Sequence, residues 1–131
     1  AIINVKLNYA AEKGIKCYTK INSDKEINTD IFVLCRILAN TLDNAIEACE
    51  RYEGDNKFIY FALSKQNTNL FIRISNSSHY VNIKSLETEK MDRIQHGLGL
   101  ESISESVKQI NGIINIMYEN NIFTTELLIN C

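Results

Sequence analysis

The sequence predicts a two-layer α/β sandwich, an α+β arrangement in which a mixed sheet of about five strands carries three helices on one face. Five short segments alternate apolar and polar residues or are rich in β-branched and aromatic residues, as strands are. Three longer segments repeat apolar residues every three or four positions, as helices do. All of them fall within 131 residues, which suffices for one domain with one core.

The composition is that of a globular domain. Hydrophobic residues make up 45% and charged residues 23%, and proline is absent, which argues against a disordered chain. The formal net charge of −2 argues against a nucleic-acid or anionic-membrane partner, because such partners need a basic surface. No apolar run approaches the ~20 residues of a membrane-spanning helix. The four cysteines form no C-x-x-C pair, so we expect reduced thiols that fill the core.

The first predicted helix covers residues 2–13 and ends at Gly14, which suits a helix C-cap. Alternation over residues 15–21 predicts a strand. A long helix follows over residues 31–52, and we expect Gly54 to close it. The N-cap residues of this helix would come from Asn28-Thr29-Asp30.

The second half of the chain predicts two antiparallel hairpins, made of residues 57–64 with 70–75 and of residues 113–118 with 122–129. A helix over residues 99–111, with Gly112 as its C-cap, joins the hairpins, so strands 70–75 and 113–118 are predicted to be parallel neighbours. The polar residues 76–96 predict no regular structure. A connection of that length is more often a lid or a binding loop than a plain linker.

The long helix carries a polar stripe. At 100° per residue, Asn40, Asn44 and Glu47 lie on one face, together with Arg36 and Arg51. The opposite face is predicted to enter the core, and it holds Ile31, Cys35, Leu38, Leu42, Ala45, Ile46 and Cys49.

Two interpretations of this stripe stay open. Most polar helix faces simply meet solvent. Asparagine, however, is a poor helix former, and two asparagines one turn apart give an exposed face no charge pairing. They do provide two neutral carbonyl oxygens, which Mg²⁺ accepts when phosphates and waters supply its other ligands.

A glycine turn, His96-Gly97-Leu98-Gly99-Leu100, precedes the third helix. Glycines let the backbone approach a ligand, and the N–H groups of a helix N-terminus attract anions, so the turn could hold phosphate. A plain loop-to-helix turn explains the same residues. The segment is not a Walker A loop, and it lacks the third glycine and the preceding strand of a dinucleotide-binding fingerprint.

These motifs together resemble those of the GHKL superfamily of gyrase, Hsp90, histidine kinases and MutL. Residues 38–48, LANTLDNAIEA, resemble its asparagine box, and residues 96–100, HGLGL, resemble its second glycine box. The strand IRISNS, residues 72–77, stands where most members carry D-x-G-x-G, with Asn76 in place of the aspartate that reads adenine. This replacement is similar to that in peptide quorum-sensing histidine kinases of the accessory gene regulator type. The resemblance implies a Bergerat-type ATP-binding fold.

Several roles follow from the resemblance alone. Asn40 and Asn44 would be the catalytic residues that hold Mg²⁺ and the triphosphate of ATP, and Asn76 would read the adenine. The remaining nucleotide-binding residues would be Glu47, Lys90, His96, Gly97, Leu98, Gly99 and Leu100. Gyrase-like ATPases carry a water-activating glutamate where this chain has Asn40, whose amide cannot take up a proton, so phosphoryl transfer is favoured over hydrolysis.

The function implied is that of the ATP-binding catalytic domain of a sensor histidine kinase, covering residues 15–131. Residues 1–14 would be the tail of the dimerisation helix or a linker from it. The phosphoacceptor histidine would lie on an adjoining helical domain, since neither His79 nor His96 falls on a predicted helix. A response regulator downstream, a membrane-anchored homodimer and a cytoplasmic location would follow. An anti-sigma-type serine kinase and a non-catalytic nucleotide-sensing or partner-binding module stay open as alternatives.

Overall fold

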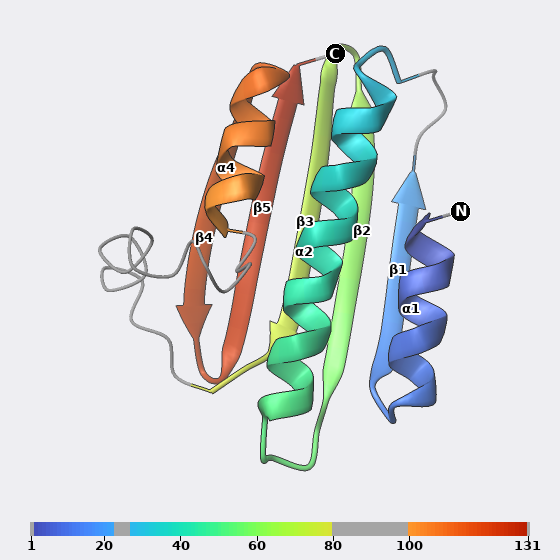
Figure 1. The fold of residues 1–131 in the computed structure, drawn as a ribbon, viewed down its shortest axis with the longest axis vertical. Helices are drawn as coiled ribbons and strands as arrows, with labels where there is room; N and C mark the ends of the chain where they lie inside the picture. Colours follow the sequence, from blue (N-terminus) through green and yellow to red (C-terminus); the bar gives the residue numbers. More distant parts are fainter. Residues whose placement is uncertain (1, 23–26, 80–99, 131) are drawn as a thin grey trace.

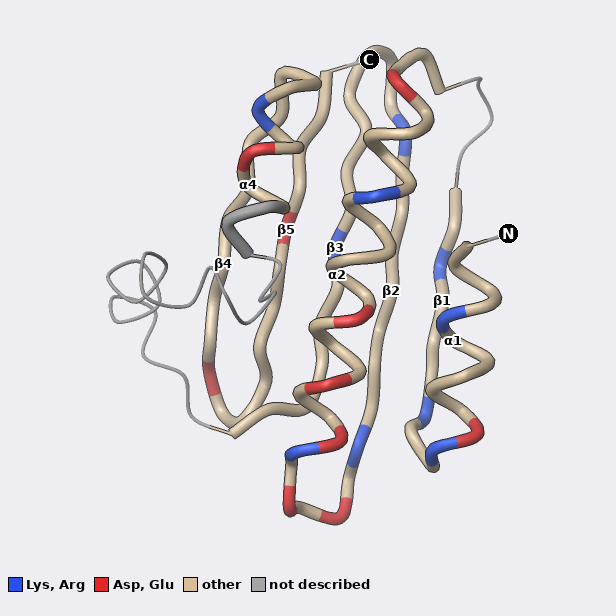
Figure 2. Tube along the Cα trace, viewed as in Figure 1, with Lys and Arg blue, Asp and Glu red and all other residues tan. Residues whose placement is uncertain are grey.

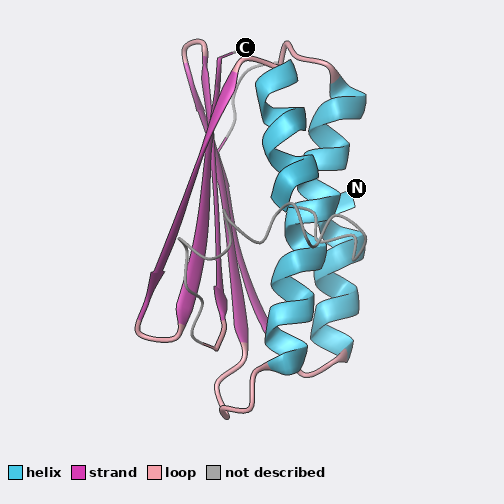
Figure 3. Ribbon diagram, turned by 60° about the vertical axis from the view of Figure 1, so that its left-hand side comes forward, coloured by secondary structure: helices cyan, strands magenta, loops and turns pink. Residues whose placement is uncertain are grey.

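The computed structural model describes residues 2–22, 27–79 and 100–130. Their elements are α1 (Ile2–Glu12), β1 (Lys16–Asn22), α2 (Ile31–Arg51), β2 (Phe58–Gln66), β3 (Asn69–Ser77), α4 (Leu100–Gln109), β4 (Gly112–Glu119) and β5 (Ile122–Asn130). The three helices lie on one face of a five-stranded sheet (Figure 1; Figure 3). The predicted two-layer sandwich is therefore confirmed. None of the described helices has the length and apolar character that a membrane span requires.

The sheet is mixed, with the strand order β1-β2-β3-β5-β4. β1 pairs with β2 in parallel, and the other three pairings are antiparallel. Both predicted hairpins form. The predicted parallel pairing of β3 with β4 is wrong, because β5 lies between them and is antiparallel to both. The parallel pair of the mixed sheet is β1 with β2 instead.

The core lies between the helices and the sheet, with α2 in the middle, where it contacts both other helices and the central strands β2 and β3 (Figure 1). Every second residue of β2 and β3 points into this layer, as the pleat of a strand requires. The helix-facing apolar residues of these two strands are Ile59, Phe61, Leu63, Leu70, Ile72 and Ile74. α1 belongs to the same core through Leu7 and Ala10.

Two helix ends differ from the prediction. α2 ends at Arg51 with Tyr52 as its C-cap in an extended conformation, so Gly54 does not close the helix. At the end of α4, Asn111 takes the left-handed conformation, with φ of 56°, while Gly112 is already the first residue of β4. Asparagine tolerates that conformation, which is why it can replace glycine there. Gly14 has φ of 83° and caps α1 as predicted.

The buried face of α2 is wider than predicted, because helices flank it on both sides. Val33 and Ile37, which lie roughly 20° and 60° from Asn40 around the helix, are buried. Ile31, predicted to be in the core, is 54% exposed because it is the first residue of the helix. The predicted core residues Leu38, Leu42, Ala45, Ile46 and Cys49 are all buried.

Candidate functional site

The polar stripe of α2 lies away from the sheet, as its spacing predicts. Asn40 and Asn44 are each half-buried, and Glu47 is exposed. Among the residues that the structure describes, none forms a hydrogen bond with either asparagine side chain. Two amide groups one helical turn apart thus have no structural partner among residues 2–22, 27–79 and 100–130, although helix interiors disfavour asparagine.

The two flanks of α2 are covered by different helices. On one flank, Asp43 forms an ion pair with Lys6 of α1, with 2.8 Å between Lys6 Nζ and Asp43 Oδ1. α4 covers the other flank, where Ile37 is buried, and runs beside the N-terminal half of α2 (Figure 1). Asn44 follows Ile37 by seven residues, so it lies on nearly the same flank. Helical periodicity therefore places the asparagine pair toward the side of α2 that α4 flanks.

The C-terminal half of α2 is acidic (Figure 2). Asp43 is neutralised by Lys6, but Glu47 and Glu50 are exposed and have no ion-pair partner in the described part of the chain. A bare triphosphate would be repelled by these carboxylates. A divalent cation next to the asparagines would remove that repulsion.

Most of the predicted phosphate-binding segment lies outside the described residues, namely Lys90, His96, Gly97, Leu98 and Gly99. Leu100 is the first residue of α4, as the position of the glycine turn before a helix predicts.

Asn76 is buried near the end of β3, with 2% of its surface exposed, and points toward the helices. Its side-chain Nδ2 donates a hydrogen bond to the backbone oxygen of Ser77 at 3.0 Å. That bond leaves the side-chain oxygen as the free end of the amide, because no described residue donates to it. The Cys49 thiol donates to the same Ser77 oxygen at 3.7 Å, so the end of β3 is held against the C-terminal half of α2.

Two aromatic residues that the sequence analysis missed lie in the same row as Asn76 on the helix-facing side of the sheet. Phe123 of β5 is the cross-strand partner of Asn76, and Tyr118 of β4 is the partner of Phe123. Directly paired residues project from the same face of a sheet, so all three point toward the helix layer. No sequence pattern marks Phe123, because the pairing depends on β5 inserting beside β3.

The residues after β3 are fixed by hydrogen bonds from two sides. Ser78 N donates to Asn121 O at 3.0 Å, and the Tyr118 hydroxyl donates to Ser78 O at 3.2 Å. His79 Nε2 accepts from Glu53 N at 3.1 Å, so the chain leaving β3 is also tied to the loop after α2. His79 lies in no helix, as predicted, and its ring is engaged in this contact.

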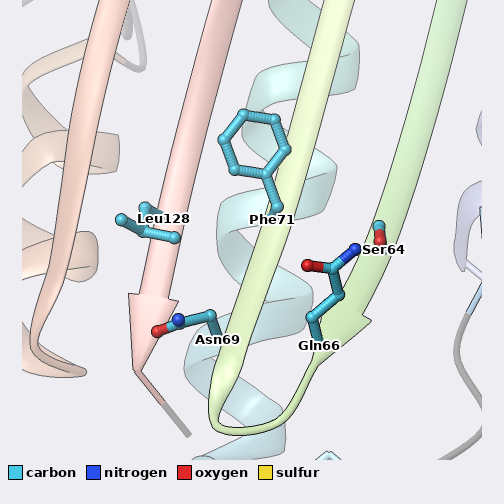
Figure 4. Close-up of a pocket in the computed structure, with 5 residues that line it drawn as sticks. All are labelled: Ser64, Gln66, Asn69, Phe71 and Leu128. Atoms are coloured by element: carbon cyan, nitrogen blue, oxygen red, sulfur yellow. The ribbon is translucent and has the colours of Figure 1, made fainter.

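Two hollows lie on the face of the sheet that the helices do not cover. The sheet therefore separates them from Asn40, Asn44 and Asn76. One, of about 280 Å³, is lined by Ser64, Gln66, Asn69, Phe71 and Leu128 (Figure 4). The second, of about 360 Å³, overlaps it and extends to Lys20 and Arg73. Since the asparagines lie on the helix side, neither hollow belongs to the candidate site.

The Cys17 and Cys49 thiols are structural rather than reactive. Cys17, Cys35 and Cys49 are unpaired, as the sequence predicts. Burial raises the pKa of the Cys49 thiol to about 11, and burial also raises that of Cys17. Both therefore stay protonated near neutral pH, and a thiol is a weak nucleophile and metal ligand. Among residues 2–22, 27–79 and 100–130, no three His, Cys, Asp or Glu side chains gather as a metal site.

Comparison with known proteins agrees with this geometry. The family model described as GHKL domain matches residues 28–130. No curated protein sequence matches the chain. Among solved structures, the nucleotide-free catalytic domain of histidine kinase ThkA superimposes with a TM-score of 0.81 at 18% identity, covering 98% of this chain and 86% of that one.

Two further structures show the same fold in longer proteins. The Acinetobacter baumannii histidine kinase AdeS has a TM-score of 0.71 at 13% identity, covering 98% of this chain and 62% of its own. Full-length ShkA in complex with AMPPNP has a TM-score of 0.74 at 19% identity, covering 99% of this chain and 29% of its own. At such identities the likeness establishes the fold, which is that of histidine kinase catalytic domains.

Proposed function

Because this chain belongs to the GHKL domain family, we propose that it is the ATP-binding catalytic domain of a sensor histidine kinase. It would hold Mg-ATP between α2 and the glycine turn before α4, and it would pass the γ-phosphoryl group to a histidine on a neighbouring helical domain. The observation that carries the proposal is the pair of amides on α2, which are half-buried and without structural partners in the described chain.

The residues present fit a bound magnesium ion. The side-chain oxygens of Asn40 and Asn44 are hard neutral ligands of the kind that Mg²⁺ accepts alongside phosphate and water. Exposed Glu47 adds negative charge that would attract the cation. When bound, the ion would neutralise charge on the phosphates.

The position of Asn76 supports adenine recognition. Its Nδ2 is committed to Ser77 O, so its oxygen is left to accept a hydrogen bond. The amino group of adenine can donate that bond, whereas the oxo group at the same position of guanine cannot. A neutral amide held this way reproduces the acceptor role of the usual aspartate without its charge. Phe123, beside Asn76 in the sheet, offers an apolar surface for the base.

Transfer to another side chain is favoured over hydrolysis. Asn40 stands where a water-activating carboxylate would be needed, and an amide is no general base at neutral pH. The protein's contribution would be to position the nucleotide and to stabilise charge on the transferred group.

Nucleotide binding tests the proposal directly. We would titrate the 131-residue chain with ATP and Mg²⁺ in a calorimeter and compare Asn44→Ala with Asn8→Ala, a substitution of an exposed asparagine on α1. Asn44→Ala should weaken Mg-dependent binding at least tenfold, about 1.4 kcal/mol, and Asn8→Ala should leave it unchanged. Equal binding by both variants would reject the metal assignment.

The chemical stability of the product separates the kinase classes. With labelled ATP and a tethered helical acceptor, acid-labile label on histidine supports the histidine kinase. Acid-stable label on serine would support an anti-sigma-type serine kinase. Binding without label on either would leave a nucleotide-sensing or partner-binding module. Tethering matters because it raises the effective concentration of the acceptor.

The wider setting is also a proposal. The Asn76-Ser77 pair supports a kinase of the peptide quorum-sensing, accessory gene regulator type. Such a protein would be a membrane-anchored homodimer with this domain in the cytoplasm, acting on a response regulator. Finding several membrane spans and a histidine-bearing helix encoded directly upstream would support this setting, and an upstream region lacking both would reject it.

A further inference from the structure

We propose that the edge strand β4 pairs with β4 of a second copy of this chain, so that two five-stranded sheets join into one. Within the described residues β5 is the strand that pairs with β4, so the row of backbone N–H and C=O groups along the outer edge of β4 meets no second partner strand there. Such a row is a template for another strand.

The two edges of the sheet differ in how they are protected. Natural edge strands are usually guarded by lysine, proline, a bulge or a charged residue. β1, at the other edge, carries Lys16 and Lys20. β4 has the sequence GIINIMYE, with no lysine or proline, and its single charge is Glu119 at the last position. Of the two edge strands, β4 is therefore the one whose own sequence carries no such guard before its last residue.

The sequence of β4 is complementary to itself when two copies run antiparallel around Asn115. In that register Ile113 lies opposite the second copy's Met117, and Ile114 opposite its Ile116. Residues that alternate along a strand project from alternate faces, so the first pair shares the outer face and the second the helix side. Glu119 would lie opposite Asn111, and no like charges meet. This match is the reason for choosing a second copy as the partner.

The side chains on the outer face favour the same contact. Ile113 is 66% exposed and Met117 is 39% exposed. Ile113 pairs with Leu128, and Leu128 pairs with Phe71, so an apolar row crosses the outer face and reaches the β4 edge (Figure 4 shows Phe71 and Leu128). In the paired form this row would continue into Met117 of the second copy. Burying exposed apolar surface would stabilise the contact.

The contact is expected to be weak in the free domain, because one strand pair buries little area. We would measure sedimentation of the 131-residue chain at concentrations up to about 1 mM, which reaches the Kd expected of a weak contact. Ile113→Lys should weaken dimerisation at least about tenfold. Ile21→Lys is the matched control, because Ile21 is 57% exposed on the opposite edge strand, and it should change nothing. A chain that stays monomeric throughout, or equal effects of the two variants, would overturn the proposal.

Two further variants test the register. Mixing Ile113→Lys with Met117→Glu should restore association, since the lysine of one copy then faces the glutamate of the other. Asn115→Cys should be cross-linked by a short bismaleimide far faster than Thr19→Cys, which lies at the centre of β1. Both variants keep the native thiols, so the difference isolates the β4 contact. No rescue on mixing, or equal cross-linking of both cysteine variants, would show that β4 does not pair in this way.

Discussion

Replacing Asn76 by aspartate should make the stability of the domain depend on pH. The native Nδ2 donates to Ser77 O at 3.0 Å, and the side chain is 2% exposed. In Asn76→Asp, an ionised carboxyl would lose that bond and face a carbonyl oxygen in a buried site. Burial raises the pKa of such a carboxyl, because the charged form is the one that desolvation penalises.

The loss of the hydrogen bond on ionisation, about 1 kcal/mol, and the desolvation of the charge both raise the pKa of the new carboxyl. A combined rise of roughly two units corresponds to a penalty of about 3 kcal/mol. The folded state then binds the proton more tightly than the unfolded state. The penalty is therefore absent below a pH of about 4, the unfolded-state pKa. It grows as the pH rises to the pKa of the folded state, and it is constant above that value.

Thermal unfolding at pH 4 and pH 8 provides the assay. At pH 4 the protonated acid can still donate to Ser77 O, so Asn76→Asp should unfold near the temperature of the unmodified protein. At pH 8 it should unfold lower by on the order of 10 °C. Asn69→Asp, at the exposed start of β3 where the residue pairs with uncharged Gln66 and Asn130, controls for adding a carboxylate. A decrease in unfolding temperature that is the same at both pH values would refute the inference that the Asn76 amide is buried and held by a single hydrogen bond.

Four further changes test the fold and the site. Asp30→Ala removes the acceptor of two N–H bonds at the start of α2 (3.0 and 3.3 Å) and should cost about 1 kcal/mol in urea unfolding, whereas an unchanged midpoint would deny the cap its role. Gly112→Ala places a Cβ 2.7 Å from Val107 Cγ1 and should destabilise by about 1–3 kcal/mol; an unaltered unfolding temperature would contradict that packing. The raised pKa of Cys49 stabilises the folded state below pH 9, and this contribution is lost as the pH rises toward 11. The difference in the free energy of unfolding between the unmodified protein and Cys49→Ala should therefore narrow across that range. A constant difference would argue against a buried thiol. Asn40→Glu supplies a general base and should raise ATP hydrolysis at least about tenfold; retained binding without faster hydrolysis would remove Asn40 from the reaction centre.

Local features of this protein follow from a few neighbouring residues. The Asp30 cap, the Gly14 turn and both hairpins were all predictable, because capping bonds, backbone sterics and alternation act within a few positions. The polar stripe of α2 was predictable for the same reason, since helical periodicity alone puts Asn40 and Asn44 on one face. The placement of that stripe away from the sheet is confirmed, and its role in binding stays a prediction.

The order of the strands was decided only by the tertiary structure. The local pattern of the β4–β5 hairpin would be satisfied equally well if β4, and not β5, lay beside β3. Instead, β5 lies between β3 and β4. That choice brings Phe123 beside Asn76, because it sets which residues of distant strands are paired. The exposure of Ile31 likewise depends on where α2 begins relative to its neighbours. Backbone sterics and periodicity act along the chain and can be read from it, whereas pairing and burial are settled by which distant segments pack together.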